Sequence, residues 1–202
     1  MSSKINSKDI INKQKEKYND SKWSKFLTQE FDKPEFEKLL DQLIAGVSQG
    51  NTFTPPMKSW FNDFNTMDPD NLKVVIISQD SEYIPHLPNM INYNLEELNK
   101  QGVMFYNLGR TKVGEDIQLD EWRMFNIYFL DYLLSTRKDI VYVFIGYKAE
   151  EFAEIINTDE HGYKIFLPPS DHPVWTNGSL NNMFKNNINM MLENLKHEPI
   201  NW

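Results

Sequence analysis

The chain has 202 residues, no cysteine and a formal net charge of −8. This length suits one domain with a sizeable core, and the lack of thiols excludes disulfides, thiolate zinc sites and a cysteine nucleophile. The acidic balance argues against phosphate binding over the whole surface, so any contact with nucleic acid needs a local site. No apolar run approaches the roughly 20 residues of a membrane span, and no secretory signal is recognisable, so we expect a soluble intracellular protein.

The N-terminal part is predicted to be helical after a polar start. Residues 1–20 are mostly charged and polar, so we expect a frayed helix or a tail with weak order at its start, followed by a single domain over residues 21–202. Apolar residues at three- and four-residue spacing predict helices across residues 21–47. Pro34 suits an early position of the second of these helices, with Asp32 as its cap.

Short strands alternate with helices in the rest of the chain. The β-branched run over residues 73–78 is typical of a strand that is covered on both faces. Further strands are predicted over residues 103–106, 140–145 and 163–167, helices over 94–101, 121–135, 149–156 and 181–195, and loops over 46–56 and 107–120. This alternation predicts an α/β fold of three layers, in which a central four-stranded parallel sheet is flanked by helices.

Polar side chains follow three of the predicted strands, at the carboxyl edge where open parallel sheets bind ligands. Asp80 follows the first strand, Asn107 the second and His172 the fourth. A carboxylate can orient or deprotonate a water, an amide can bond the edge of a nucleobase, and an imidazole can donate to an oxygen that gains charge. Structural roles also fit: Asp and Asn form turns and caps, and His172 can bond Asp171. The shared edge favours a functional site.

A series of motifs runs along the chain in a fixed order. They include KVVIISQD at residues 73–80, QGVMFYN at 101–107 and EPINW at 198–202, together with segments at 23–36, 54–56, 141–146 and 172–173. Over nearly the whole chain they resemble the motifs of family 1 uracil-DNA glycosylases, among them GQDPYH, QGVLLLN and KPIDW. The resemblance implies that family's fold and an activity that flips uracil out of the duplex and holds it by its edge.

The resemblance also implies roles for individual residues. Asp80 would position the attacking water, and His172 would stabilise the charge on the leaving uracil. The implied base-binding residues are Gln79, Asn107 and Tyr83. The implied DNA-contacting loops carry Thr54, Pro55, Pro56, Gly146, Tyr147, Pro173 and Trp175. Trp175 suits either a wedge between bases or packing within its loop. No metal and no cofactor is implied, because this chemistry needs neither.

The chain departs from the family's motifs at residues that hold the base and the DNA. Glu82 stands where the family has the tyrosine that excludes thymine, and Tyr83 reaches that position only after a one-residue shift. At about 4 Å and an effective dielectric of 20, a carboxylate beside a developing negative charge costs on the order of 4 kcal/mol. Val174 and Tyr147 replace serines that grip phosphates, and Thr176 replaces the leucine wedge. The stacking phenylalanine has no counterpart, which costs roughly 1–3 kcal/mol per base.

These departures lead to one hypothesis and two alternatives. The hypothesis is a divergent homologue with weakened or lost base excision that acts as a binding module on DNA or in a protein complex, in replication or in sensing uracil. Some viral relatives are such scaffolds, so the host cytoplasm, nucleoid or nucleus is an expected location. The first alternative is an active repair hydrolase that releases uracil or another base from double- or single-stranded DNA through Asp80 and His172. The second is a regulator or decoy that binds proteins and not DNA.

Overall fold

The computed structural model describes residues 6–79, 94–114, 116–157, 160, 162–169 and 178–202, of which residues 178–182 by backbone alone. In chain order the elements are α1 (Ser7–Tyr18), α2 (Ser24–Phe31), α3 (Pro34–Ser48), β1 (Phe53–Thr54), η1 (Met57–Ser59), α4 (Asn62–Thr66), η2 (Pro69–Asn71), β2 (Val74–Ser78), α5 (Leu95–Lys100), β3 (Val103–Asn107), β4 (Lys112–Val113), β5 (Asp116–Ile117), α6 (Leu119–Thr136), β6 (Ile140–Ile145), α7 (Tyr147–Glu150), η4 (Ala153–Ile155), β7 (Gly162–Leu167) and α9 (Gly178–Asn194).

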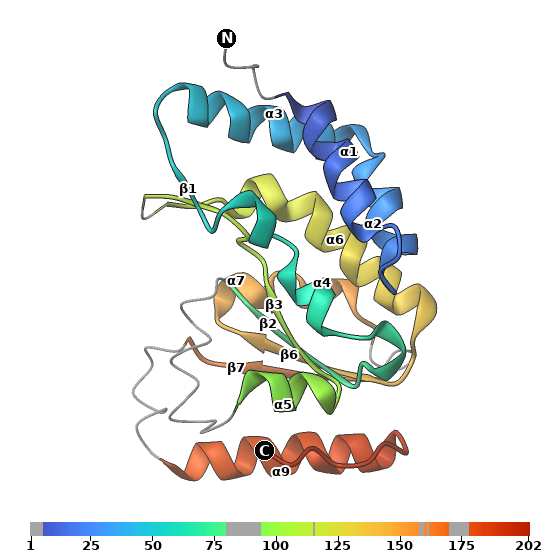
Figure 1. The fold of residues 1–202 in the computed structure, drawn as a ribbon. Coiled ribbons are helices and arrows are strands. Elements are labelled where there is room, and N and C mark those ends of the chain that lie inside the picture. The colour runs from blue at the N-terminus through green and yellow to red at the C-terminus, as the bar shows by residue number, and fades with distance from the viewer. Residues whose placement is uncertain (1–5, 80–93, 115, 158–159, 161, 170–177) are drawn as a thin grey trace.

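A four-stranded parallel sheet with the order β3-β2-β6-β7 forms the centre of the fold. The two inner strands β2 and β6 are buried at every residue, because helices cover both faces of the sheet. Figure 1 shows α1, α2, α3 and α6 on one side of the sheet and α5 and α9 on the other. The predicted α/β class and the predicted central sheet are therefore confirmed.

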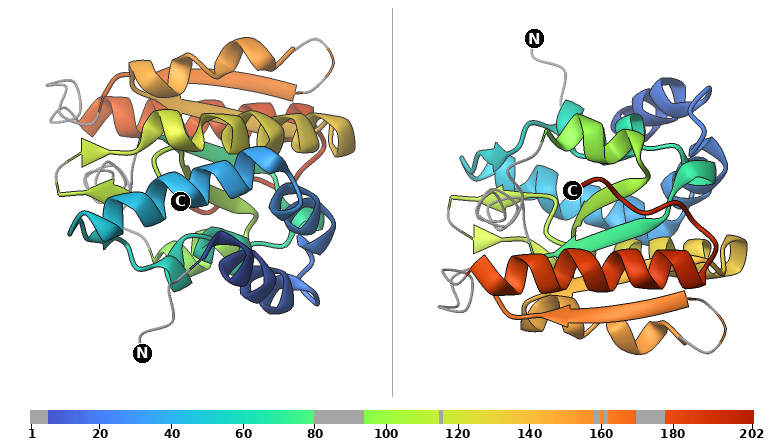
Figure 2. Two further views of the ribbon diagram at one scale, coloured as in Figure 1. Left: turned by 90° about the horizontal axis from the view of Figure 1, so that it is seen from above. Right: turned by 90° about the horizontal axis from the view of Figure 1, so that it is seen from below.

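Alternating side chains of the sheet build two separate cores. On one face Val75 and Ile77 of β2 pack into an aromatic cluster with buried side chains of α2, α3, α4 and α6. On the other face Val74 and Ile76 pack with side chains of α5, α9 and Trp202. The two views of Figure 2 show the helices of each layer lying over the sheet. Because side chains alternate along a strand, this split also assigns each polar residue at the strand ends to one of the two faces.

Residues 7–18 of the polar N-terminal segment form the helix α1. Asn6 caps α1 by accepting a hydrogen bond from the backbone N–H of Asp9 at 2.8 Å. The buried residues of α1 recur along one stripe of the helix: Ser7, Ile10, Ile11, Gln14 and Tyr18. This stripe packs against α2 and α3. These few buried residues are enough to pack α1 against its neighbours, because they share one helical face.

Two local predictions were wrong. Asp32 ends α2 rather than capping α3, whose first residue Pro34 follows Lys33 without a side-chain cap. The segment expected to be a loop over residues 107–120 holds β4 and β5, which join β1 in a small antiparallel sheet. Strands of two residues carry too little alternation to be recognised from sequence.

Candidate functional site

Asn107 and Ser78 form the last pair of residues between β3 and β2 at the carboxyl edge of the sheet. Ser78 is fully buried and Asn107 is half-buried. The hydroxyl of Ser78 donates to Oδ1 of Asn107 at 3.1 Å. By alternation from Val74 and Ile76, both side chains belong to the α5–α9 face of the sheet. The predicted base-reading amide of Asn107 therefore lies at the predicted edge, and the hydroxyl of Ser78 bonds its oxygen.

Backbone pairing continues past the ends of β2 and β3. Leu108 donates its N–H to the carbonyl of Ser78 at 2.9 Å, and Gly109 donates to the carbonyl of Gln79 at 2.7 Å. A Cβ added to Gly109 would lie 2.2 Å from Cγ2 of Ile117 and 3.1 Å from the carbonyl oxygen of Gln79, so this position has no room for a side chain. Gln79, a predicted base-binding residue, is thus anchored by its backbone to the segment that follows Asn107.

Gly146 and Tyr147 stand at the end of β6, on the same edge. Gly146 has a φ of 82°, which favours glycine, and its N–H donates to the carbonyl of Leu167 at 2.9 Å. Tyr147 begins α7 with 73% of its surface exposed. An exposed aromatic ring at the carboxyl edge of the sheet has the chemistry for stacking, whereas the serine expected from the family resemblance would offer a hydroxyl.

Thr54, Pro55 and Pro56, a predicted DNA-contacting loop, lie at β1 beside the end of β3. Thr54 and Pro56 are exposed. The indole of Trp60 donates to the carbonyl of Pro55 at 2.9 Å and so holds this loop. A cavity of about 340 Å³ lies here, lined by Thr54, Pro55, Ser59, Trp60, Asn62, Asp63, Asn107, Gly109, Arg110 and Lys112. The structure thus brings the proline loop and Asn107 to one cavity.

A buried ion pair that sequence reasoning missed lies in the wall of this cavity. Arg110 is 5% exposed and donates to both carboxylate oxygens of Asp63, at 3.0 and 2.9 Å, and to the carbonyl of Trp60 at 2.9 Å. Its guanidinium lies 4.5 Å from the ring centre of Tyr106 and 5.0 Å from that of Phe64. Burial lowers the pKa of Arg110, but the charge and hydrogen bonds of Asp63 together with the hydroxyl of Tyr106 outweigh burial and raise the pKa above its ordinary value.

Burial of an arginine has no signal in the sequence, because arginine is usually exposed. Ser78 did have a signal: it is a polar residue at the end of an apolar run, directly before Gln79 and Asp80.

The other predicted site residues lie outside the described part of the chain. They are the predicted catalytic residues Asp80 and His172 and the predicted contacts Tyr83, Pro173 and Trp175, together with the replacements Glu82, Val174 and Thr176. Their roles stay predictions.

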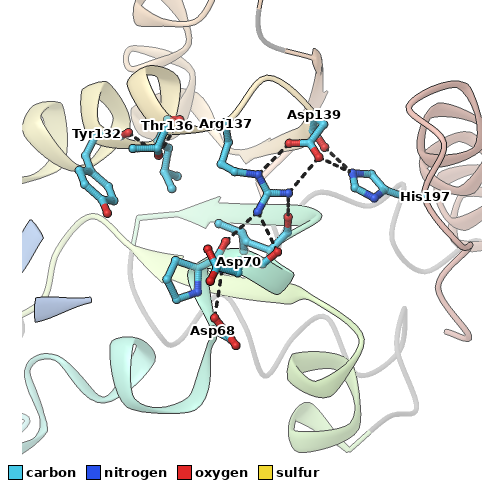
Figure 3. Close-up of polar contacts among 10 residues, drawn as sticks. Asp68, Asp70, Tyr132, Thr136, Arg137, Asp139 and His197 are labelled. Carbon is cyan, nitrogen blue, oxygen red and sulfur yellow. Dashed lines mark hydrogen bonds and ion pairs between the residues drawn. The ribbon is translucent and has the colours of Figure 1, made fainter. Parts of the chain in front are cut away.

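A second polar cluster lies at the amino edge of the sheet, at the opposite ends of the strands (Figure 3). Arg137, at the end of α6, donates to the carbonyls of Pro69 and Leu72 at 2.7 and 2.9 Å and to both carboxylate oxygens of Asp139. Nε2 of His197 lies 3.1 Å from the carboxylate of Asp139. The cluster ties α6, the start of β2 and the segment after α9 together at the edge opposite to the candidate site.

Within the residues that the structure covers, no cluster of three or more His, Cys, Asp or Glu side chains is arranged to hold a metal ion. No helix in the same residues is long and apolar enough to cross a membrane.

Solved structures with a similar fold identify the class of α/β protein to which this sheet order belongs. The crystal structure of mimivirus uracil-DNA glycosylase matches with a TM-score of 0.73 and 18% identity, over 98% of this chain and 90% of that one. The UNG crystal structure from Nitratifractor salsuginis matches with a TM-score of 0.62 and 14% identity, over 90% and 97%. A mimivirus UNG variant in complex with UGI matches with a TM-score of 0.75 and 19% identity, over 90% and 87%. These matches show a uracil-DNA glycosylase fold.

Curated proteins are also similar to this chain in amino-acid sequence. The uracil-DNA glycosylase of Campylobacter lari is 25% identical over 215 residues, which cover 89% of this chain and 93% of the relative. That of Amoebophilus asiaticus is 26% identical over 214 residues, covering 89% and 96%. No protein-family model matches the chain. The chain is a divergent homologue of the uracil-DNA glycosylases, as its motifs predicted.

Proposed function

We propose that this protein binds an extrahelical base in DNA at the carboxyl edge of its sheet, with base excision that is weakened or lost. The observation that carries the proposal is the half-buried amide of Asn107, held by Ser78 on the last rung of the sheet. An amide there offers a donor and an acceptor to the edge of one base. The fold supports a base-flipping protein, because an enzyme that acts on a base has to extract it from the stack.

Weakened excision is proposed from the residues that replace the family's DNA and base contacts. By the motif resemblance, the exposed Tyr147 replaces a serine that grips a phosphate in the family, and Glu82, Val174 and Thr176 replace three further residues of the family's motifs. The net charge of −8 opposes duplex binding, which depends on phosphate neutralisation. A protein that keeps a base-reading amide but loses phosphate contacts suits a binding role in a DNA-associated or protein complex. The UGI complex of a mimivirus UNG supports a protein partner for a chain of this fold.

An active glycosylase is the second candidate, favoured by curated relatives of that name that span 89% of the chain. Asp80 would then position a water whose oxygen bonds the sugar carbon as the glycosidic bond breaks. His172 would donate a hydrogen bond to the oxygen of the departing base while that base carries negative charge. No metal or cofactor enters this proposal.

The test measures uracil release and binding together, with the Campylobacter lari relative as the reference enzyme. Single- and double-stranded oligonucleotides with and without uracil are compared over a series of salt concentrations. We expect selective binding of the uracil-containing strand with release far slower than by the reference. Release at the reference rate, abolished by Asp80→Asn and reduced by His172→Ala, would establish the active enzyme instead. Absence of DNA binding at low salt would reject both and leave a protein-binding regulator.

A further inference from the structure

We infer that Ser78 is a positioning residue that fixes the amide of Asn107 in one orientation and thereby selects bases with a keto oxygen over bases with an amino group. The inference rests on the proposed base binding at Asn107. It adds a residue that acts through Asn107 and contacts no substrate itself.

The position of Ser78 brings its hydroxyl to the amide of Asn107. Ser78 lies between Asn107 on β3 and Ile145 on β6 in the register of the sheet. It is fully buried, and its backbone carbonyl is bonded by the N–H of Leu108 at 2.9 Å. The strand end therefore has little freedom, and the hydroxyl reaches Oδ1 of Asn107 at 3.1 Å from a fixed backbone.

The hydrogen bond divides the polar atoms of the Asn107 amide between the protein and a ligand. With Oδ1 turned to the serine hydroxyl, both N–H bonds of Nδ2 remain for acceptors, and Oδ1 keeps a second lone pair. A base with a keto oxygen beside a ring N–H satisfies Nδ2 and Oδ1 together. A base with an amino group at the same place would bring a donor against the donor of Nδ2, which leaves polar groups unpaired and costs binding.

Without the hydroxyl, the amide can rotate by half a turn and exchange its donor and acceptor. Ser78→Ala should therefore reduce selectivity more than it reduces stability. Loss of one hydrogen bond of this kind corresponds to a change of roughly threefold to tenfold in relative affinity. Ser78→Thr keeps a hydroxyl on the same carbon and should keep the selectivity.

The binding experiment uses two single-stranded oligonucleotides that differ at one central nucleotide, 2′-fluoro-2′-deoxyuridine or the cytidine counterpart, so that no base is released. Fluorescence anisotropy measures the ratio of the two dissociation constants. Thr111→Val is the matched control, because it removes another fully buried hydroxyl, one that accepts from the indole of Trp122 at 2.8 Å. We expect Ser78→Ala to lower the ratio and Thr111→Val to leave it unchanged. An unchanged ratio in Ser78→Ala overturns the inference.

A second measurement separates this inference from the proposed function. The Asn107 side-chain amide is observed by ¹H–¹⁵N NMR in the free protein and assigned by its loss in Asn107→Asp. We expect one sharp pair of resonances in the wild type and an exchange-broadened pair in Ser78→Ala, with Thr111→Val like the wild type. If the wild type binds neither oligonucleotide, the proposed function fails while this readout still tests the orientation of the Asn107 amide. Equal binding of both oligonucleotides by the wild type overturns the selectivity that the inference assigns to Ser78. A pair that stays sharp in Ser78→Ala overturns the positioning role.

Discussion

Arg110 donates from both terminal nitrogens of its guanidinium to the two carboxylate oxygens of Asp63, at 3.0 and 2.9 Å, inside a ring of aromatic side chains. This pair joins α4 to the segment that follows Asn107, in the wall of the cavity at the carboxyl edge. A buried pair of opposite charges therefore forms part of the wall of the candidate site, next to an apolar core.

Removing one partner of this pair should be far more harmful than removing both. Arg110→Met leaves the largely buried carboxylate of Asp63 unpaired and should cost about 3–5 kcal/mol in the free energy of unfolding. Arg110→Met with Asp63→Leu replaces both charges by apolar groups and should recover most of that loss. Urea denaturation of the wild type, both single variants and the double variant measures the coupling. A double variant as unstable as Arg110→Met would contradict this account.

Tyr147 should contribute to DNA binding and not to stability. Because its side chain is mostly exposed, Tyr147→Ala should change the free energy of unfolding by less than about 0.5 kcal/mol. Loss of a stacking ring should weaken single-stranded DNA binding by about 1–3 kcal/mol. Fluorescence anisotropy measures the affinity, with Tyr147→Phe expected to bind like the wild type. Met190→Ala is the control for an exposed apolar side chain, on α9. Equal losses in Tyr147→Ala and Met190→Ala would remove the case for stacking.

Gly109→Ala should damage both the fold and the base site. The added Cβ meets Cγ2 of Ile117 and the carbonyl of Gln79, which accepts a hydrogen bond from Gly109 itself. We expect a loss of about 1–3 kcal/mol in the free energy of unfolding, because an over-packed site has to shift. We also expect weaker binding of the uracil-containing oligonucleotide at a temperature where the variant is folded. Unaltered affinity in the folded variant would show that Gln79 and its neighbours tolerate the shift.

Protonation of Asp139 should make the protein less stable in acid. The hydrogen bonds from Arg137 hold the pKa of Asp139 below its ordinary value of 3.8, and the charges of Arg137 and His197 act in the same direction (Figure 3). A carboxyl with a lowered pKa in the folded state stabilises above its unfolded pKa, and this stabilisation is lost as the pH falls through the folded pKa. Because Asp139 is partly exposed, the effect should stay below about 1 kcal/mol. Asp139→Asn should be less stable than the wild type at pH 7, with a difference that shrinks towards pH 3 in urea denaturation. A pH-independent difference would contradict the assignment.

Glu30 should make the stability of the protein depend on pH in the opposite direction. Burial raises the pKa of Glu30 above 4.5, against the hydrogen bond and charge of Lys33, while the charge of Glu35 also raises it. The folded state then binds the proton more tightly than the unfolded state, so stability declines as the pH rises from the unfolded to the folded pKa. Glu30→Gln removes the titration, and its stability relative to the wild type should rise between pH 4 and pH 7. Parallel stability curves of the two proteins would show that Lys33 compensates the burial fully.

Local patterns in the sequence were enough for the architecture. The apolar run of residues 74–77 and its alternation with helices predicted the parallel sheet, because a strand buried on both faces is apolar along most of its length. The same order of elements placed Asn107 at the carboxyl edge. The two-residue strands of the small sheet were missed, because their signals are short and acquire meaning only through the strands that they pair with.

The sequence by itself determined the fold class, the strand ends and the kinship with uracil-DNA glycosylases, since these depend on residue type and order. Only the tertiary structure decided which groups meet. The bond between Ser78 and Asn107 depends on the register of two strands, and the pair of Arg110 and Asp63 joins residues 47 positions apart. Hydrogen bonds and buried charges need distances of a few ångströms, and such distances arise only when packing brings separate segments together.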